Sequence, residues 1–254
     1  MTFWVELPRD FVSVSGPDAV SFLQGQLSQD VEGLAVGSSA WSFVLQPQGK
    51  VDAWLRVTRS ADDAFVLDVD RGWGEAVVAR LERFMLRTKA TFEALPDWHC
   101  IAVRGDGPDD LDLRGPDVSP PEGVPEGTAE DYEVWRITHG VPAMGRELTE
   151  KTIPAESGVV DRSVSFTKGC YTGQELVARI DSRGGNVPRR LRLVALGDGA
   201  PTPEPGTPVV VEGAEVGVIT SAARSVALAY VKRDVDPPAE ATVAGAAARI
   251  EALP

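Results

Sequence analysis

Cysteine and histidine are scarce in this sequence of 254 residues. There are two cysteines, Cys100 and Cys170, with no C-x-x-C pair, and two histidines, His99 and His139, without an H-x-x-x-H spacing. Two thiols fall short of the four cysteine ligands that an iron–sulfur cluster usually needs, and the histidine spacing does not favour a zinc site. Two widely separated cysteines in a cytosolic protein also give no reason to expect a disulfide. We therefore expect no resident metal and no disulfide framework.

Long apolar runs are also missing. No stretch approaches the roughly 18 apolar residues that are needed to cross a bilayer. The first ten residues, MTFWVELPRD, lack the basic flank and apolar stretch of a secretory signal. We therefore expect a cytoplasmic protein that does not bind membranes. The hydrophobic fraction of 43% and the charged fraction of 25% are typical of a globular protein.

Positive charge is in short supply, with 25 basic against 38 acidic residues and a net charge of −13. Such a chain lacks the basic surface that nucleic-acid phosphates require, so we expect no direct nucleic-acid binding. The basic residues are unevenly distributed: residues 104–161 hold 14 acidic and 5 basic residues, whereas residues 162–192 hold 7 basic and 2 acidic ones. This basic island either holds an anionic small molecule or is a solvated surface strip.

The clearest chemical pattern lies in residues 166–179, which read FTKGCYTGQELVAR. The segment places Cys170 between a predicted short strand at 164–166 and a predicted helix. Thr172 and Glu175 have the spacing of a capping box, which marks the start of a helix.

The position of Cys170 favours a reactive thiol. Gly169 and Gly173 allow the backbone to turn tightly on either side. The helix N-terminus and Lys168 bring positive charge close to the sulfur, which favours the thiolate, the reactive form of cysteine. The alternative is that Cys170 is a small buried residue that fills space under the turn, since free cysteine is often buried.

The block KGCYTGQE, residues 168–175, resembles the signature of the YgfZ family of folate-binding proteins, which are related to the T-protein of the glycine cleavage system. Three further segments resemble the family in the same order along nearly the whole chain. They are VSGPDAVSFLQGQLSQDV (14–31), LQPQGKVDAWLRV (45–57) and RITHGVPAMGRELTEKTIPAESGV (136–159). The signature block is specific, and the other segments gain weight from their order.

The resemblance implies an α+β fold, with a folate-binding region of two ferredoxin-like halves of the T-protein type and a small C-terminal antiparallel β-barrel. We expect the folate-binding region at residues 1–187, with halves at about 1–95 and 96–187, and the barrel at 188–254. The residues themselves predict strands and single helices in the first part, and short strands with frequent turns in the last.

Individual elements follow from the pattern of apolar residues. We expect a first helix capped by Ser15, an amphipathic helix at 74–89 and a loop in the Gly- and Pro-rich stretch 105–127. The predicted strands lie at 41–45, 51–57, 64–69, 98–103, 133–139, 164–166, 209–211, 216–220, 225–231 and 241–250.

Three functions remain open. The resemblance implies a tetrahydrofolate-binding factor that assists iron–sulfur cluster assembly or repair, and so indirectly tRNA modification, with cluster proteins or assembly factors as partners. The first alternative is a folate-dependent aminomethyl transferase like the T-protein. The chain is much shorter than that enzyme, however, and carries a cysteine where the enzyme uses none. The second alternative is a folate-binding interaction module without catalysis.

The resemblance also implies roles for individual residues. Cys170 would be the nucleophile or a transient thiolate ligand, assisted by Lys168. The residues expected to bind folate, or one of its one-carbon derivatives, are Gly169, Tyr171, Gly173, Gln174, Glu175, Arg179, Arg183 and Asp30, with Arg189 as a further candidate for the folate carboxylates.

Several of these residues have structural alternatives. Tyr171 either stacks on a ring, covers the thiol or is a buried structural residue. Glu175 has a capping role without any ligand, and Arg179 follows it at i+4, where a salt bridge within the helix competes with anion binding. The transferase relies on an aspartate near the folate. Asp30 and Asp52 are candidates, and Asp30 is equally well explained as a residue that ends a helix.

Overall fold

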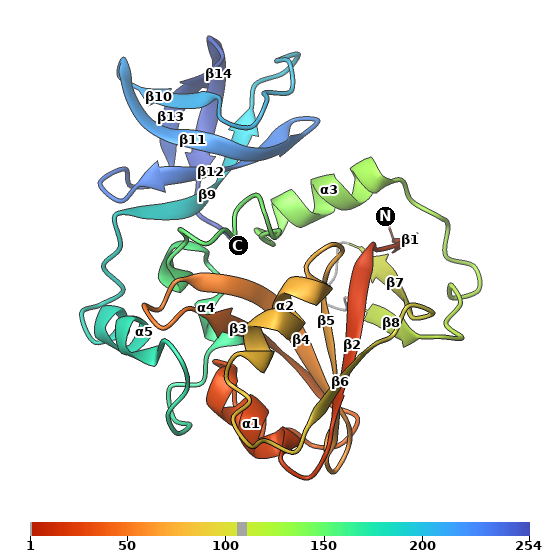
Figure 1. Cartoon of the computed structure of the whole chain (residues 1–254). Coiled ribbons are helices and arrows are strands. Elements are labelled where there is room, and N and C mark those ends of the chain that lie inside the picture. Colours follow the sequence, from red (N-terminus) through yellow and green to blue (C-terminus); the bar gives the residue numbers. More distant parts are fainter. Residues whose placement is uncertain (1, 106–110) are drawn as a thin grey trace.

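The computed structural model describes residues 2–105 and 111–254, and its largest sheet has five antiparallel strands in the order β3-β4-β5-β2-β6 (Figure 1). The strands are β2 (Arg9–Ser15), β3 (Ser39–Leu45), β4 (Val51–Ala61), β5 (Ala64–Asp70) and β6 (Thr91–Ala94). Two helices, α1 (Ala19–Gln26) and α2 (Gly74–Glu82), pack on this sheet.

Both faces of this sheet are covered, and the alternation along β5 shows how. Phe65 and Leu67 belong to the main apolar core, which also holds residues of α1 and α2. Val66, between them, points to the opposite face and packs in a second cluster with Cys100. Successive side chains of a strand point to opposite faces. The continuous apolar runs of β3 and β5 are therefore those of strands buried on both sides.

The second face is covered by a three-stranded antiparallel sheet in the order β1-β7-β8. Its strands are β1 (Phe3–Glu6), β7 (His99–Arg104) and β8 (Leu111–Gly115). The next elements are α3 (Ala129–Thr138), the 3₁₀ helix η1 (Pro154–Glu156), α4 (Val160–Ser163) and α5 (Gln174–Asp181).

The C-terminal part is a closed barrel in the strand order β10-β11-β12-β9-β14-β13. The strands are β9 (Arg189–Leu196), β10 (Pro208–Val211), β11 (Ala214–Ala223), β12 (Val226–Lys232), β13 (Ala239–Val243) and β14 (Ala246–Glu251). Figure 1 shows α3 between the barrel and the N-terminal sheets. The predicted α+β class with a C-terminal antiparallel barrel is confirmed.

Two predicted strands are wrong, each for a local reason. Residues 133–139, predicted as a strand, lie in α3 and the residue after it. The missed signal is a capping box in which the Thr128 hydroxyl accepts from the Asp131 N–H and the Asp131 carboxylate accepts from the Thr128 N–H. Residues 164–166 form no strand, because Val164 only ends α4 and Ser165 donates its N–H to the Ser28 carbonyl.

Further differences concern boundaries. Ser15 ends β2 and does not cap α1, which starts after Asp18. The helix predicted at 74–89 stops at Glu82. Within the stretch predicted as a loop, residues 111–115 form β8, while residues 106–110 lie outside the described residues. The single strand predicted at 241–250 is the hairpin β13–β14.

Candidate functional site

The strand register brings polar and aromatic side chains together on the second face of the five-stranded sheet. Trp41 pairs with Arg56, Arg56 with Asp68, and Asp68 with Phe11 across β3, β4, β5 and β2. Directly paired residues point to the same face of a sheet. One transverse row therefore combines an indole, a guanidinium and a carboxylate beneath the three-stranded sheet.

Asp68, which is fully buried, is the centre of an ion network. Its carboxylate accepts from Arg9 (2.7 Å), Arg56 (3.0 Å) and Arg114 (2.9 Å). Burial opposes ionisation of Asp68, but the three arginines outweigh it and hold its pKa at about 2. The Asp68 carboxylate is therefore ionised at neutral pH.

A second carboxylate, Asp112 of β8, extends this network. It accepts from Arg56 at 2.7 Å and lies 2.7 Å from Arg104. Burial would raise its pKa, but Arg56 and Arg104 lower it. The network ties β8 to the larger sheet and fixes the orientation of the guanidinium groups.

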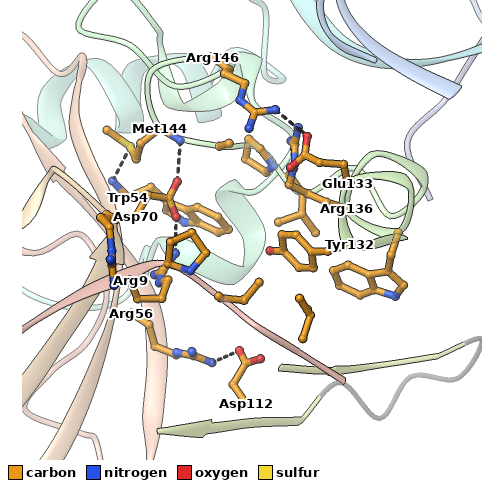
Figure 2. Close-up of a pocket in the computed structure, with 18 of the residues that line it drawn as sticks. Arg9, Trp54, Arg56, Asp70, Asp112, Tyr132, Glu133, Arg136, Met144 and Arg146 are labelled. Atoms are coloured by element: carbon orange, nitrogen blue, oxygen red, sulfur yellow. Dashed lines mark hydrogen bonds and ion pairs between the residues drawn. The ribbon is translucent and has the colours of Figure 1, made fainter. Parts of the chain in front are cut away.

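These side chains form one wall of a cavity of about 520 Å³ (Figure 2). The opposite wall comes from α3 and residues 141–146. In Figure 2 Trp54 and Asp70 lie on one side of the cavity, and Tyr132, Glu133 and Arg136 lie on the other. Seven arginines and four acidic residues line the cavity: Arg9, Arg56, Arg71, Arg104, Arg136, Arg146 and Arg162, with Glu6, Asp70, Asp112 and Glu133.

Aromatic rings provide the apolar part of the lining. Trp41 and Trp54 are stacked with ring centroids 4.0 Å apart, and the Arg56 guanidinium lies 5.1 Å from the Trp41 ring. Burial raises the pKa of Tyr132, so its hydroxyl stays protonated. The buried indole N–H of Trp135 has no hydrogen-bond partner among the described residues. The cavity thus offers flat rings, cationic groups and an unused donor to a ligand.

The signature segment lies elsewhere, between α4 and α5 and beside α1. The Thr172 N–H donates to the Gly25 carbonyl at 3.0 Å, which fastens the segment to α1. Cys170 is exposed. The alternative that Cys170 is a buried packing residue is therefore wrong.

Lys168 is held in place by the end of α1. Its ammonium group donates to the carbonyl oxygens of Gln24 (2.6 Å), Leu27 (2.8 Å) and Gln29 (2.9 Å). Burial lowers the pKa of Lys168 to about 8, and Asp30 acts in the opposite direction. The ammonium form therefore predominates at neutral pH. All three of its N–H bonds are used by these carbonyls, so none is left to donate to Cys170.

The turn before α5 depends on Gly173 and not on the predicted capping box. Gly173 has a φ of 82°, and a Cβ there would lie 2.4 Å from the Gln46 carbonyl oxygen. Glu175 makes no capping bond, and the Thr172 hydroxyl donates to the Gln26 side chain at 3.4 Å. The Gln174 side chain closes the turn by accepting from the Tyr171 N–H at 3.2 Å.

The remaining predicted residues have varied surroundings. A Cβ on Gly169 would meet no atom within 4 Å. The Lys168 ammonium lies 5.2 Å from the Tyr171 ring, and burial raises the pKa of Tyr171 to about 12. Glu175, Arg179 and Arg183 are exposed on and after α5.

The predicted carboxylates and Arg189 have structural partners. Asp30 accepts from the Gln24 side chain at 2.9 Å, which organises the turn after α1. Asp52 accepts from Arg80 at 2.7 Å. Arg189 donates to Glu156 at 3.2 Å and lies over the Tyr230 ring.

None of the residues predicted to act in catalysis or folate binding is among the described residues that line the cavity. Among the described residues of the basic island, Arg162 lines the cavity, with its guanidinium 5.0 Å from the Trp54 ring. The signal for the cavity was charge inside predicted strands: Arg56 and Asp68 interrupt apolar runs at 51–57 and 64–69. A charged side chain inside a buried strand needs a partner of opposite charge. Which strand supplies that partner follows only from the fold.

The described residues contain neither a membrane-spanning helix nor a cluster of metal ligands. No helix there is long and apolar enough to span a membrane. No group of three or more histidine, cysteine, aspartate and glutamate side chains in that part of the chain is arranged to hold a metal ion.

Comparisons with known proteins bear on both parts of the chain. A family model described as the CAF17 C-terminal beta-barrel domain matches residues 189–252. An uncharacterised protein of Haemophilus influenzae is 30% identical over 188 residues, covering 69% of this chain and 67% of that protein. A tRNA-modifying protein YgfZ of an Enterobacter species is 26% identical over 235 residues, covering 76% of this chain and 71% of that protein.

A further relative and a solved structure also resemble this chain. An iron–sulfur cluster assembly factor IBA57 homologue, mitochondrial, from Pyricularia oryzae is 30% identical over 209 residues, which cover 69% of this chain and 53% of that protein. This chain therefore spans about half of its length. The crystal structure of aminomethyltransferase T of the glycine cleavage system from Bartonella henselae superimposes with a TM-score of 0.80 at 18% identity, covering 100% of this chain and 86% of that one. At that identity the likeness shows the fold.

Proposed function

Because this chain belongs to the YgfZ family, we propose that it binds a reduced folate in the cavity described above and assists iron–sulfur cluster assembly or repair. Cys170 acts as the reactive thiol, and the effect on tRNA modification is indirect, through enzymes that contain clusters. The relatives' names support this role, since one is an iron–sulfur cluster assembly factor and another a tRNA-modifying protein.

The cavity carries the folate part of the proposal. Its volume of about 520 Å³ is within the range of roughly 300–1,000 Å³ that is usual for small-molecule sites. Folate combines a flat pterin, a benzoyl ring and glutamate carboxylates. The stacked Trp41–Trp54 pair suits a flat ring, the unpartnered Trp135 N–H suits an acceptor, and arginine suits a carboxylate.

Bound tetrahydrofolate would supply one-carbon chemistry, and this chain's residues would bind and orient it. The ion network around Asp68 holds Arg9 and Arg56 in fixed positions along one wall. Fixed guanidinium groups lose little conformational entropy when they bind a carboxylate. The site is therefore organised before any ligand enters.

Buried hydrogen bonds connect this cavity with the segment that carries the thiol. The Trp54 indole N–H donates to the Ser163 hydroxyl at 2.9 Å, and the Ser28 hydroxyl donates to the Ser163 carbonyl at 2.6 Å. The Ser165 N–H donates to the Ser28 carbonyl at 3.0 Å. A ligand that moves Trp54 would therefore act on the chain five residues before Cys170.

Calorimetric titration with tetrahydrofolate or its 5-formyl derivative tests the binding step. We expect saturable heat, and we expect Trp41→Ala to weaken it by about tenfold, since base–aromatic stacking of this kind contributes about 1–3 kcal/mol. Phe92→Ala, which removes a ring outside the cavity, is the control. Absence of heat at millimolar ligand removes folate from the proposal.

Substitution of the thiol tests the second step. We expect Cys170→Ser to keep the fold and the folate affinity, because the side chain is exposed, and to abolish support of cluster enzymes in cells that lack the natural gene. Cys100→Ser is the matched change at the other thiol. Its free energy of unfolding and its support of cluster enzymes are measured beside those of Cys170→Ser. Full complementation by the Cys170→Ser form means that the chemistry does not involve this sulfur.

The second candidate is a folate-dependent aminomethyl transferase, which the T-protein fold brings into consideration. Purified protein incubated with tetrahydrofolate and an aminomethyl-loaded lipoyl carrier separates the two candidates. Turnover favours the transferase. We expect none, because Asp30 and Asp52, the candidates for the aspartate that the transferase needs near the folate, are not among the described residues that line the cavity.

A further inference from the structure

Three of the arginines that line the cavity are exposed: Arg71, Arg146 and Arg162. The other four, Arg9, Arg56, Arg104 and Arg136, are largely buried, with side-chain exposures of 2–11%. The exposed three therefore lie where the cavity meets solvent. We call them the mouth arginines.

Hydrogen bonds to Met144 bring the surroundings of two mouth arginines, Arg71 and Arg162, close together. The Met144 N–H donates to the Asp70 carboxylate at 2.8 Å, and the Trp54 N–H donates to the Met144 sulfur at 3.3 Å (Figure 2). Arg71 follows Asp70 in the chain, and the Arg162 guanidinium lies over the Trp54 ring at 5.0 Å. Arg71 is thus the neighbour in sequence, and Arg162 the ring contact, of residues that bond to Met144.

The third mouth arginine comes from the same corner. Arg146 follows Gly145, and a Cβ on Gly145 would lie 3.6 Å from the Trp73 ring. Trp73 belongs to the short turn that begins with Arg71. Residues 71–73 and 145–146 are therefore neighbours in space, although they are more than 70 positions apart in the sequence.

The charge of the mouth arginines is only partly neutralised. Arg146 lies 2.6 Å from Glu133, but the same carboxylate also binds Arg136 at 2.9 Å (Figure 2). Arg136 has a second anion in the buried Glu147 at 3.1 Å, so Glu133 is shared only in part and Arg71 carries the excess charge. The Arg71 side chain has no ion pair or hydrogen bond with any described residue. In a chain with a net charge of −13, a local excess of positive charge at a cavity opening calls for an anionic ligand.

We infer that the mouth arginines bind the glutamate chain of a folate poly-γ-glutamate. This inference rests on the proposed folate site. A pterin held between the aromatic walls leaves the glutamate end of the ligand to reach the opening. Each added γ-linked glutamate carries one more carboxylate on a flexible chain, and guanidinium groups bind carboxylates in a bidentate manner. Several exposed arginines around one opening match several carboxylates on one chain.

Calorimetry with the monoglutamate and the pentaglutamate of 5-formyltetrahydrofolate tests this inference. We expect the pentaglutamate to bind about tenfold more tightly at low ionic strength, because exposed pairs each contribute about 0.2–1 kcal/mol. The advantage falls as salt is added. We expect Arg71→Gln and Arg146→Gln each to remove much of this advantage and to weaken the monoglutamate by a smaller factor, because its carboxylates also lie at the opening.

Arg83→Gln, which removes an exposed arginine after α2 and outside the cavity, is the matched control. Free penta-γ-glutamate without a pterin should give no heat at concentrations where the conjugate saturates. Equal affinity for the two folates overturns the inference and leaves the folate site standing, whereas binding of neither removes the proposed function itself. An equal loss in Arg83→Gln shows a net-charge effect, and tight binding of the free peptide shows a separate peptide site. Either result also overturns the inference.

Discussion

Cys100 and Cys170 have opposite surroundings, and this difference determines which thiol is able to react. Cys170 is exposed, whereas Cys100 is fully buried in β7. Burial, with Asp112 and Asp68 nearby, raises the pKa of Cys100 to about 12. Thiolate is the nucleophilic form, so Cys100 is inert at neutral pH.

We expect iodoacetamide to label native protein at Cys170 alone and to label Cys100 only in denaturant. Mass spectrometry of the alkylated peptides measures both. Bound folate should change the rate at Cys170, because buried hydrogen bonds link Trp54 to the chain before it. Fast labelling of Cys100 in native protein contradicts the burial described here, and a pH profile of Cys170 labelling reports its thiolate character.

Asp68 is the residue on which the cavity wall depends most. Asp68→Asn leaves Arg9, Arg56 and Arg114 without their shared carboxylate, and breaking a buried pair costs about 3–5 kcal/mol. We expect a loss of that size in urea unfolding. Asp63→Asn, in the exposed β4–β5 turn, is the control, with an expected change within about 0.5 kcal/mol.

The same residue gives the stability a dependence on pH. The folded pKa of Asp68 is about 2, below the value of about 3.9 in an unfolded chain. Its contribution is therefore complete above about pH 4 and is lost as the pH falls toward 2, because the unfolded state binds the proton first. Urea midpoints between pH 5 and 2.5 should fall more steeply for the natural protein than for Asp68→Asn. Parallel slopes would assign the acid sensitivity to other groups.

At the scale of elements, the turn before α5 is fixed by one glycine. Gly173 has a left-handed φ of 82° and its α-carbon lies against the β3–β4 turn. We expect Gly173→Ala to destabilise the protein by at least about 1 kcal/mol, since a Cβ there is strained and meets the Gln46 carbonyl oxygen.

Gly169→Ala is the matched control, because a Cβ at that position meets nothing within 4 Å. It should change the free energy of unfolding by less than about 0.5 kcal/mol. Thermal or urea unfolding of the two variants measures the difference. If the two variants are equally stable, the turn does not require glycine at position 173, and Gly173 has a different role in the signature.

The elements also show where sequence patterns are sufficient. The strands at 41–45, 51–57, 64–69 and 98–103 are confirmed within β3, β4, β5 and β7, because their apolar patterns and turn residues are local. The strand predicted at 133–139 is wrong because it includes apolar residues of a helix whose capping residue, Thr128, lies five positions earlier. Side chains that cap a helix outweigh the weak strand preference of Val134 and Ile137.

At the scale of the whole molecule, the barrel is attached through the buried Glu147. Its carboxylate accepts from Arg136 at 3.1 Å and from Ser221 of the barrel at 2.6 Å. Tyr230, also in the barrel, donates to the Glu147 carbonyl at 2.9 Å. We propose residues 1–187 and 188–254 as the two domains, and this contact couples them.

We expect Glu147→Gln to destabilise the protein by about 3 kcal/mol, since it leaves Arg136 without a buried anion. We also expect it to separate the unfolding of the barrel from that of the rest, whereas the natural protein unfolds in one transition. Scanning calorimetry measures both. Glu240→Gln, at an exposed position of β13, is the control. A similar loss of stability in this variant would mean that the contact between Glu147 and the barrel is not the cause.

The sequence by itself determined the family, the α+β class and the C-terminal barrel, whereas the role of Cys170 stays a prediction. These follow from local patterns and from an ordered set of motifs, which are properties of the chain alone. Only the tertiary structure decided that Lys168 binds the end of α1 and that the cavity is lined by Arg9, Arg56, Tyr132 and other residues outside the signature. The contacts of Lys168 join residues 139 to 144 positions apart. Their pairing, like that of the cavity wall, is set by sheet register and helix packing, which no local pattern encodes.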